Sequence, residues 1–252
     1  MKISIVTVSY NSAATIADTM RSIAGQSHPD IEHIVVDGGS KDDTVAIVKT
    51  ADSRGARIVS EPDRGIYDAM NKGLLMASGE FVGFLNADDM LASTDTVARI
   101  AAEASAGADV VYGDLVYVHK DRPGDVIRYW NSGAFSRERL RYGWMPPHPT
   151  LYVRRSVQQA LGNFDLRLRI AADYDFMLRC LSQPGLHVRY LPRVLVRMRT
   201  GGASNRSLKA LRNKSREDLF ALRKNGIGGW MTLLCKNGRK LPQFFQRPRA
   251  QA

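Results

Sequence analysis

An asparagine and two aspartates stand where a short apolar run ends, and carboxylates in such a place can bind a cation. Glu80 to Leu85 follows a Ser-Gly turn signal and is mostly apolar, which favours a strand buried on both faces. Asn86-Ala87-Asp88-Asp89 comes directly after it. Because side chains alternate along a strand, Asn86 and Asp88 should point to one side and Asp89 to the other. For an isolated aspartate pair, a solvated turn with Asp88 as a helix cap is the more common structure.

Two more carboxylates stand at the ends of predicted elements. Asp37 follows the β-rich run from Ile31 to Val36, and Asp173 begins a segment with apolar residues at helical spacing up to Leu181. In a doubly wound sheet, Asp37 and Asp88 come to the same edge, where ligands usually bind. Considered alone, Asp37 is equally well explained as a turn residue before two glycines as by a ligand-binding role. An aspartate in the position of Asp173 is more often a helix N-cap than a functional residue.

The acidic edge favours a metal–nucleotide complex over a bare phosphate ligand. Carboxylates alone repel a diphosphate, and the sequence contains neither GxxxxGK[ST] nor GxGxxG, the glycine-rich motifs that bind phosphates through backbone N–H groups. A carboxylate-bound Mg²⁺ or Mn²⁺ can bridge to a diphosphate. We therefore expect a divalent metal together with a nucleotide at this edge.

Alternating strand and helix signals must position these carboxylates. Over the first 107 residues the alternation predicts a doubly wound, mostly parallel α/β sheet with helices on both faces and right-handed crossovers. Residues 108–205 contain short strand signals joined by turns, which predicts a smaller mixed or antiparallel sheet. Strands are expected at 3–10, 31–36, 57–60, 80–85, 110–112, 115–118 and 126–130, and helices near 12–23, 44–49, 65–77, 94–105 and 173–181.

Composition indicates one large α/β domain with a C-terminal extension. The chain has 252 residues, 44% of them hydrophobic, and contains no apolar run of the roughly 18 residues that cross a bilayer. The N-terminus enters a strand without a signal-peptide pattern, so a cytoplasmic location is expected. Cys180 and Cys235 stand far apart without metal-ligand spacing, and both are expected to be buried, reduced thiols.

The positive charge is concentrated in residues 206–252. The net charge is +11, and this segment carries 12 Lys/Arg against Glu217 and Asp218. Its basic residues alternate with apolar ones and with Trp230, a composition that an anionic membrane surface attracts. A basic helix that packs on the domain and continues into a disordered end is an equally good interpretation. No motif supports a nucleic-acid partner.

Five segments together identify a family. The chain resembles the family 2 glycosyltransferases of the GT-A fold, in particular the bacterial ones of surface-polysaccharide synthesis. This resemblance covers 1–205 and implies a nucleotide-sugar-binding half, 1–107, and an acceptor-binding half, 108–205. It implies metal-dependent, inverting transfer of a sugar from a UDP-, GDP- or dTDP-sugar to a hydroxyl of a saccharide acceptor. A lipid-linked acceptor would suit a basic tail on the inner face of the cytoplasmic membrane. The segments are ISIVTVSYN, VVDGGSKDDT, EPDRGIYDAMNKG, GEFVGFLNADD and AADYDF.

The resemblance also implies roles for single residues. Asp173 would be the catalytic base. Asn86-Ala87-Asp88 would be the Asp-x-Asp metal motif with asparagine in first place, so Asp88 is the first metal candidate and Asp89 the second. Asp37 would accept a hydrogen bond from the base N–H, and His148 would contact the acceptor or the metal. Gly201 to Ser204 resembles a loop that closes over the diphosphate. Asn86 and Ala87 of the metal motif would also contact the donor, and the other donor-binding candidates are Thr7, Tyr10, Asn11, Asn71 and Lys72.

Two other classes of protein use related features. A sugar nucleotidyltransferase has a similar fold, but the glycine-rich basic loop that it needs after the first strand is missing here. A non-catalytic nucleotide-sugar sensor or membrane scaffold would bind without turnover. The presence of Asp173 argues against this interpretation.

Overall fold

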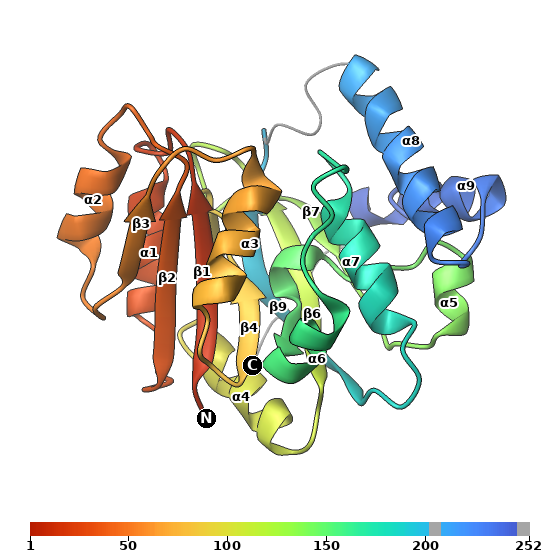
Figure 1. Ribbon diagram of the computed structural model, residues 1–252, viewed down its shortest axis with the longest axis horizontal. Coiled ribbons are helices and arrows are strands. Elements are labelled where there is room, and N and C mark those ends of the chain that lie inside the picture. The colour runs from red at the N-terminus through yellow and green to blue at the C-terminus, as the bar shows by residue number, and fades with distance from the viewer. Residues whose placement is uncertain (202–207, 246–252) are drawn as a thin grey trace.

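The first half of the chain forms a parallel sheet whose carboxyl ends meet at one edge (Figure 1). A computed structural model describes residues 1–201 and 208–245. The strand order is β3-β2-β1-β4, and all seven residues of β1 are buried, as expected for a strand covered on both faces. These strands are β1 (Ile3–Ser9), β2 (Ile31–Asp37), β3 (Arg57–Ser60) and β4 (Phe81–Phe84).

The strands of the second half have the expected mixed pairing, and they continue the same sheet. β8 (Tyr152–Arg154) runs antiparallel to both β4 and β6 (Val110–Val118), so it joins the two halves. β9 (Val188–Arg199) runs parallel to β6. β7 (Val126–Trp130) and β5 (Asp89–Leu91) pair antiparallel with β6 and β9. Asp89 therefore begins a short strand of its own.

Helices cover both faces of the sheet, as predicted from the alternation. On one face, α1 (Ile16–Ala24) and α4 (Thr96–Ser105) pack on the sheet, and α2 (Thr44–Ala51) packs on α1. On the other face, α3 (Ile66–Met76) and α7 (Ala172–Leu181) bury their apolar stripes. Short elements complete the connections: α5 (Glu138–Arg141), α6 (Arg155–Leu161), η1 (His148–Thr150) and η3 (Pro242–Phe244).

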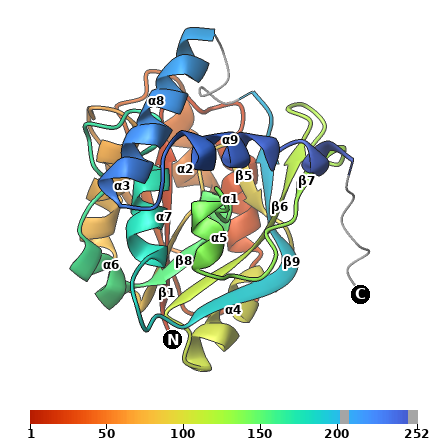
Figure 2. The same cartoon turned by 90° about the vertical axis from the view of Figure 1, so that its right-hand side faces the viewer.

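The C-terminal segment packs on the domain. α8 (Leu208–Lys224) lies along α7, and α9 (Trp230–Gly238) follows it (Figure 2). Leu219, Leu222 and Leu233 are part of the main hydrophobic core. Of the two interpretations of the basic tail, packing is thus observed for residues 208–245, while Gly202 to Ser204 of the predicted diphosphate loop lie outside the described residues.

Two further expectations concern cysteines and membrane spans. Cys180 is buried as expected, but Cys235 is exposed because it lies on the outer side of α9. Within residues 1–201 and 208–245, no helix has both the length and the apolarity needed to cross a bilayer.

Candidate functional site

Asp37 organises the loop at the carboxyl ends of β1, β2 and β3. The register of these strands brings Ser9 and Ser60 beside it, and both hydroxyls donate to its carboxylate at 3.0 and 2.7 Å. The backbone N–H groups of Gly39 and Ser40 and the Ser40 hydroxyl donate as well. Burial raises the pKa of Asp37, but these hydrogen bonds outweigh it and hold the pKa below the ordinary value. A bond from a nucleotide base would have to replace one of these donors.

Tyr10 and Asn11 form the open part of this edge. Asn11 has a left-handed backbone with φ 48°, and its side-chain oxygen accepts the Lys41 N–H at 2.9 Å. Its own N–H donates to the Ser40 hydroxyl at 2.8 Å. The resulting turn leaves the Tyr10 ring 60% exposed. The structure thus presents an aromatic surface beside the Asp37 loop.

Two of the predicted donor-binding side chains face the interior instead. Thr7 is 0% exposed, and its hydroxyl lies 3.0 Å from the buried His33 ring nitrogen, so its side chain does not face the open edge. Ala87 is buried among Ile16 and Met20, so its methyl group does not face the edge either.

Asn71 and Lys72 hold neighbouring loops. The Asn71 amide is buried and bonds the backbone of Phe164 at both ends, donating to its carbonyl at 3.1 Å and accepting from its N–H at 2.9 Å. The Lys72 ammonium donates to the Pro62 carbonyl at 3.0 Å and pairs with Glu61 at 2.7 Å. Both side chains, which were predicted to contact the nucleotide-sugar donor, therefore bond to other parts of the protein.

The acidic motif after β4 divides into an accessible and an inaccessible carboxylate. Asp88 is partly exposed, whereas Asp89 is 0% exposed in β5. Burial raises the pKa of Asp88, and burial together with the Asp88 charge raises the pKa of Asp89 well above its usual range. The Asn86 amide donates to Asp89 at 3.3 Å, and its own oxygen is buried without a partner. Asp89 consequently does not reach the open edge.

The carboxylates at this edge fit a metal ion that takes most of its ligands from a substrate. Within the described residues there is no group of three or more His, Cys, Asp or Glu side chains placed to hold a metal. Mg²⁺ and similar cations are commonly held by one or two carboxylates plus substrate phosphates. Asp88, which is partly exposed, fits the protein part of such a site.

Asp173 is fixed at the N-terminus of α7 through one oxygen. Its Oδ1 accepts the Tyr174 N–H at 2.8 Å and lies 3.0 Å from the Tyr67 hydroxyl, whose single proton is shared between this oxygen and the Ile170 carbonyl at 2.8 Å. Among the described residues, no donor bonds its Oδ2. Burial and the nearby Asp173 charge raise the pKa of Tyr67 well above its usual range, so the phenol keeps its proton and stays a donor. One carboxylate oxygen is thus left for another molecule.

His148 belongs to the aromatic core beside this aspartate. Its ring is stacked on Phe84 with centroids 5.4 Å apart and meets the edge of Phe164 at 5.8 Å. Burial lowers the pKa of His148, and the Asp173 charge acts in the opposite direction. The imidazole is therefore kept neutral and only 8% exposed.

Two residues that the sequence reasoning missed support this arrangement. Arg199, on β9, is buried, donates to the Asp88 carbonyl at 3.1 Å and pairs with Asp18. Glu217, on α8, accepts the N–H groups of the two residues before α7 at 2.8 and 3.0 Å. In the sequence, Glu217 stands out only weakly, as part of the one acidic pair in a basic segment. No local sequence pattern distinguishes Arg199.

The structure is an α/β fold with an exposed tyrosine and a partly exposed aspartate near the carboxyl edge of its parallel strands, and with a second aspartate at the start of α7. Residues 4–158 match the model described as "Glycosyl transferase family 2". This chain belongs to that family, and the fold is the GT-A fold that the sequence resemblance implied.

Relatives and solved structures agree with this assignment. A PGL/p-HBAD biosynthesis glycosyltransferase of Mycobacterium tuberculosis is 38% identical over 208 residues, covering 80% of this chain and 78% of that protein. The crystal structure of S. aureus TarS 1-349 in complex with UDP-GlcNAc has a TM-score of 0.69 at 21% identity; the match covers 90% of this chain and 66% of that one. Mannosyltransferase PcManGT from Pyrobaculum calidifontis, in complex with GDP-Man and Mn²⁺, has a TM-score of 0.65 at 21% identity and coverages of 97% and 73%. At such identities the structures show a shared fold.

Proposed function

We propose that this glycosyltransferase transfers a sugar from a nucleoside-diphosphate sugar to a hydroxyl of a saccharide acceptor, with inversion at the anomeric carbon. The observation that carries the proposal is the Asp173 carboxylate, which has one oxygen fixed and the other open. Direct displacement needs one group that accepts the proton of the attacking hydroxyl. Asp173 Oδ2 is that group, and Tyr67 and the α7 N-terminus keep the carboxylate oriented.

The donor half of the proposal uses the edge of the parallel strands. The exposed Tyr10 ring offers a face on which a uracil, guanine or thymine base stacks, and Asn11 lies beside it. Asp88 would hold Mn²⁺ or Mg²⁺, which when bound neutralises the negative charge that develops on the leaving diphosphate. In this arrangement Asp37 stabilises the loop beside the nucleotide. A hydrogen bond from the base would replace one of the hydrogen bonds that the Asp37 carboxylate already accepts.

The acceptor half of the proposal includes a membrane. Trp230, Met231 and Leu234 on α9 are exposed by 59%, 72% and 62%, and Arg239 and Lys240 follow them. Exposed apolar side chains beside basic ones suit the headgroup region of an anionic bilayer. We infer that the protein works at the inner face of the cytoplasmic membrane on a lipid-linked acceptor.

The test is a transfer and hydrolysis assay with UDP-, GDP- and dTDP-sugars in Mn²⁺, Mg²⁺ or EDTA. Release of nucleotide from one donor should require metal and fall by at least about a hundredfold in Asp173→Asn, because removal of a general base typically costs that much. Asp88→Ala should show the same loss. Asp121→Asn, at an exposed loop aspartate, is the matched control. Donor binding without turnover, even with lipid-linked acceptors present, would contradict the proposal and favour a nucleotide-sugar sensor.

A further inference from the structure

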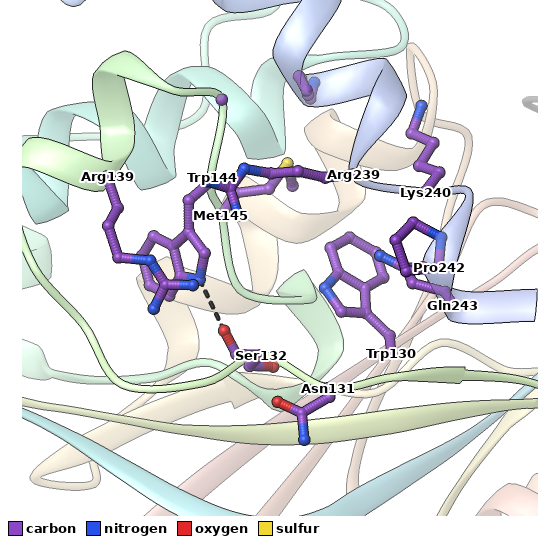
Figure 3. Close-up of a pocket in the computed structure, with 12 residues that line it drawn as sticks. Trp130, Asn131, Ser132, Arg139, Trp144, Met145, Arg239, Lys240, Pro242 and Gln243 are labelled. Atoms are coloured by element: carbon purple, nitrogen blue, oxygen red, sulfur yellow. Dashed lines mark hydrogen bonds between the residues drawn. The ribbon is translucent and has the colours of Figure 1, made fainter. Parts of the chain in front are cut away.

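A cavity of about 200 Å³ lies between the end of β7, the segment after α5 and the C-terminal residues (Figure 3). It is separate from the carboxyl edge of the parallel strands. Two tryptophans form part of its wall, and most of its charged side chains are basic. The lining residues are Trp130, Asn131, Ser132, Arg139, Gly143, Trp144, Met145, Lys236, Arg239, Lys240, Pro242 and Gln243.

The positive charge in this cavity is not balanced by carboxylates. Lys236 pairs with Asp218 at 2.7 Å. The other three cations bond neutral oxygens: Arg239 donates to the Tyr142 carbonyl at 2.9 Å, Lys240 to the Asn237 side chain at 3.0 Å, and Arg139 to a backbone carbonyl. Across residues 1–201 and 208–245, none of these three side chains pairs with an acidic group. Their charges are therefore available to an anion.

The cations also repel one another. Burial, together with the charges of Lys214 and Lys236, lowers the pKa of Lys240 to about 8, with Asp218 acting in the opposite direction. Burial and the Arg239 charge lower the pKa of Arg139. Like charges that gather in a partly buried cavity are unfavourable unless something compensates them. A bound anion would supply this compensation.

Hydrogen bonds and a ring contact connect the walls of the cavity. The Trp144 indole donates to the Ser132 carbonyl at 2.7 Å, and the Arg139 guanidinium lies over the Trp144 ring at 5.3 Å (Figure 3). Gln243 is buried and accepts the Arg128 Nε–H at 2.8 Å. These contacts position the Arg139 guanidinium, Trp144 and Gln243 before any ligand arrives, which reduces the entropic cost of binding.

We propose that this cavity binds a phosphate group of the acceptor substrate. The guanidinium groups and the ammonium on the wall of this cavity are charged hydrogen-bond donors of the kind that bind a phosphate or phosphate ester. This inference rests on the proposed function, because only a transferase has an acceptor to which the bound phosphate can belong. The Lys236 ammonium lies 3.4 Å from the centroid of the Tyr174 ring on α7, so the cavity adjoins the helix that carries the proposed base.

The experiment measures binding without any donor, metal or turnover. Calorimetric titrations in EDTA use inorganic phosphate and, separately, decyl phosphate below its micellar concentration. Wild type should bind in a saturable manner, and Arg139→Gln and Lys240→Gln should each weaken binding at least tenfold while Lys240→Arg restores it. Arg141→Gln, an exposed arginine of the same short helix that does not line the cavity, is the matched control and should bind like wild type.

The outcomes separate the two sources of phosphate and the two proposals. Tighter binding of decyl phosphate would identify a lipid phosphate, and equal binding would identify a free phosphate or a soluble ester; both support the site. Absence of saturable binding, or equal binding in Arg141→Gln and Lys240→Gln, would overturn it. Asp88→Ala should retain phosphate binding, so loss of turnover in that variant reports on the transferase proposal alone.

Discussion

The Glu217 carboxylate accepts a hydrogen bond from the Ala171 backbone nitrogen at 3.0 Å, and this contact joins α8 to the residue immediately before α7. The same oxygen accepts the Ile170 N–H at 2.8 Å. Asp173 stands two residues after Ala171. A helix of the basic C-terminal segment therefore supports the backbone that positions the proposed base.

Glu217→Ala should lower kcat about tenfold or more and change the donor KM little, because the loop loses two charge-assisted hydrogen bonds but the donor edge is untouched. Glu217→Gln keeps one acceptor oxygen and should recover part of the activity. Steady-state kinetics at several donor concentrations measure both quantities. Glu80→Gln, at an exposed glutamate near the start of β4, is the control. An increase in KM without a fall in kcat would argue against a positioning role.

Asp218 and Lys236 form a buried ion pair between α8 and α9, with exposed fractions of 2% and 5%. Asp218→Ala should destabilise the protein by about 3–5 kcal/mol, because it leaves the Lys236 ammonium buried without its partner. The double variant Asp218→Leu with Lys236→Met should regain most of this loss, since no charge is left unpaired. Urea denaturation of the three proteins tests the expectation. A double variant as unstable as Asp218→Ala would disprove the explanation.

Gly143 permits the close approach of α9 to the segment after α5. Its φ is +70°, and a Cβ there would lie 2.4 Å from the backbone nitrogen of Lys236 and 2.6 Å from the carbonyl oxygen of Thr232. Gly143→Ala should therefore loosen α9, with a loss of about 1–3 kcal/mol from strain and displaced backbone. Gly162 has a similar φ of +77°, but a Cβ there would have nothing within 4 Å, so Gly162→Ala reports a backbone cost without a steric clash. Hydrogen exchange in α9 should rise in the first variant and not in the second.

His33 should make the protein sensitive to mild acid. Burial lowers its pKa from 6.5 to about 4, with Asp52 acting in the opposite direction. The unfolded chain then binds a proton at a higher pH than the folded one, so stability is full above pH 6.5 and falls as the pH approaches 4. The loss is on the order of 3 kcal/mol. Denaturation between pH 7 and 4 should show a weaker pH dependence in His33→Gln, and an unchanged slope would assign the sensitivity to other groups.

The alternation of strands and helices was predictable because it depends on local patterns. Buried β-rich runs and apolar stripes at helical spacing are encoded over a few residues, so the parallel strands β1 to β4 and the helix after Asp173 were expected close to where they occur. β5 was missed because a three-residue strand at Asp89 has no periodicity to detect and exists through its pairing with Met198 and its neighbours.

The availability of a side chain to a ligand could not be predicted in the same way. Asn71 was expected to face the donor, but its amide bonds Phe164, 93 residues further along the chain. Thr7 was expected in a pocket, but its hydroxyl contacts His33 on the neighbouring strand β2. The assignments of Asp88 and Asp173 remain predictions, which the proposed kinetic experiments test.

The amino-acid sequence by itself determined the family, the layered α/β architecture and the carboxylates at the sheet edge and at α7, because motifs and periodicity are properties of short segments. The tertiary structure alone decided that the basic C-terminal helices pack on α7, that Glu217 supports the loop before Asp173, and that unpaired cations line a cavity beside two tryptophans. The physical reason is that burial and pairing depend on partners distant in sequence. A charge pattern reveals that such groups exist, and only packing determines which of them are satisfied.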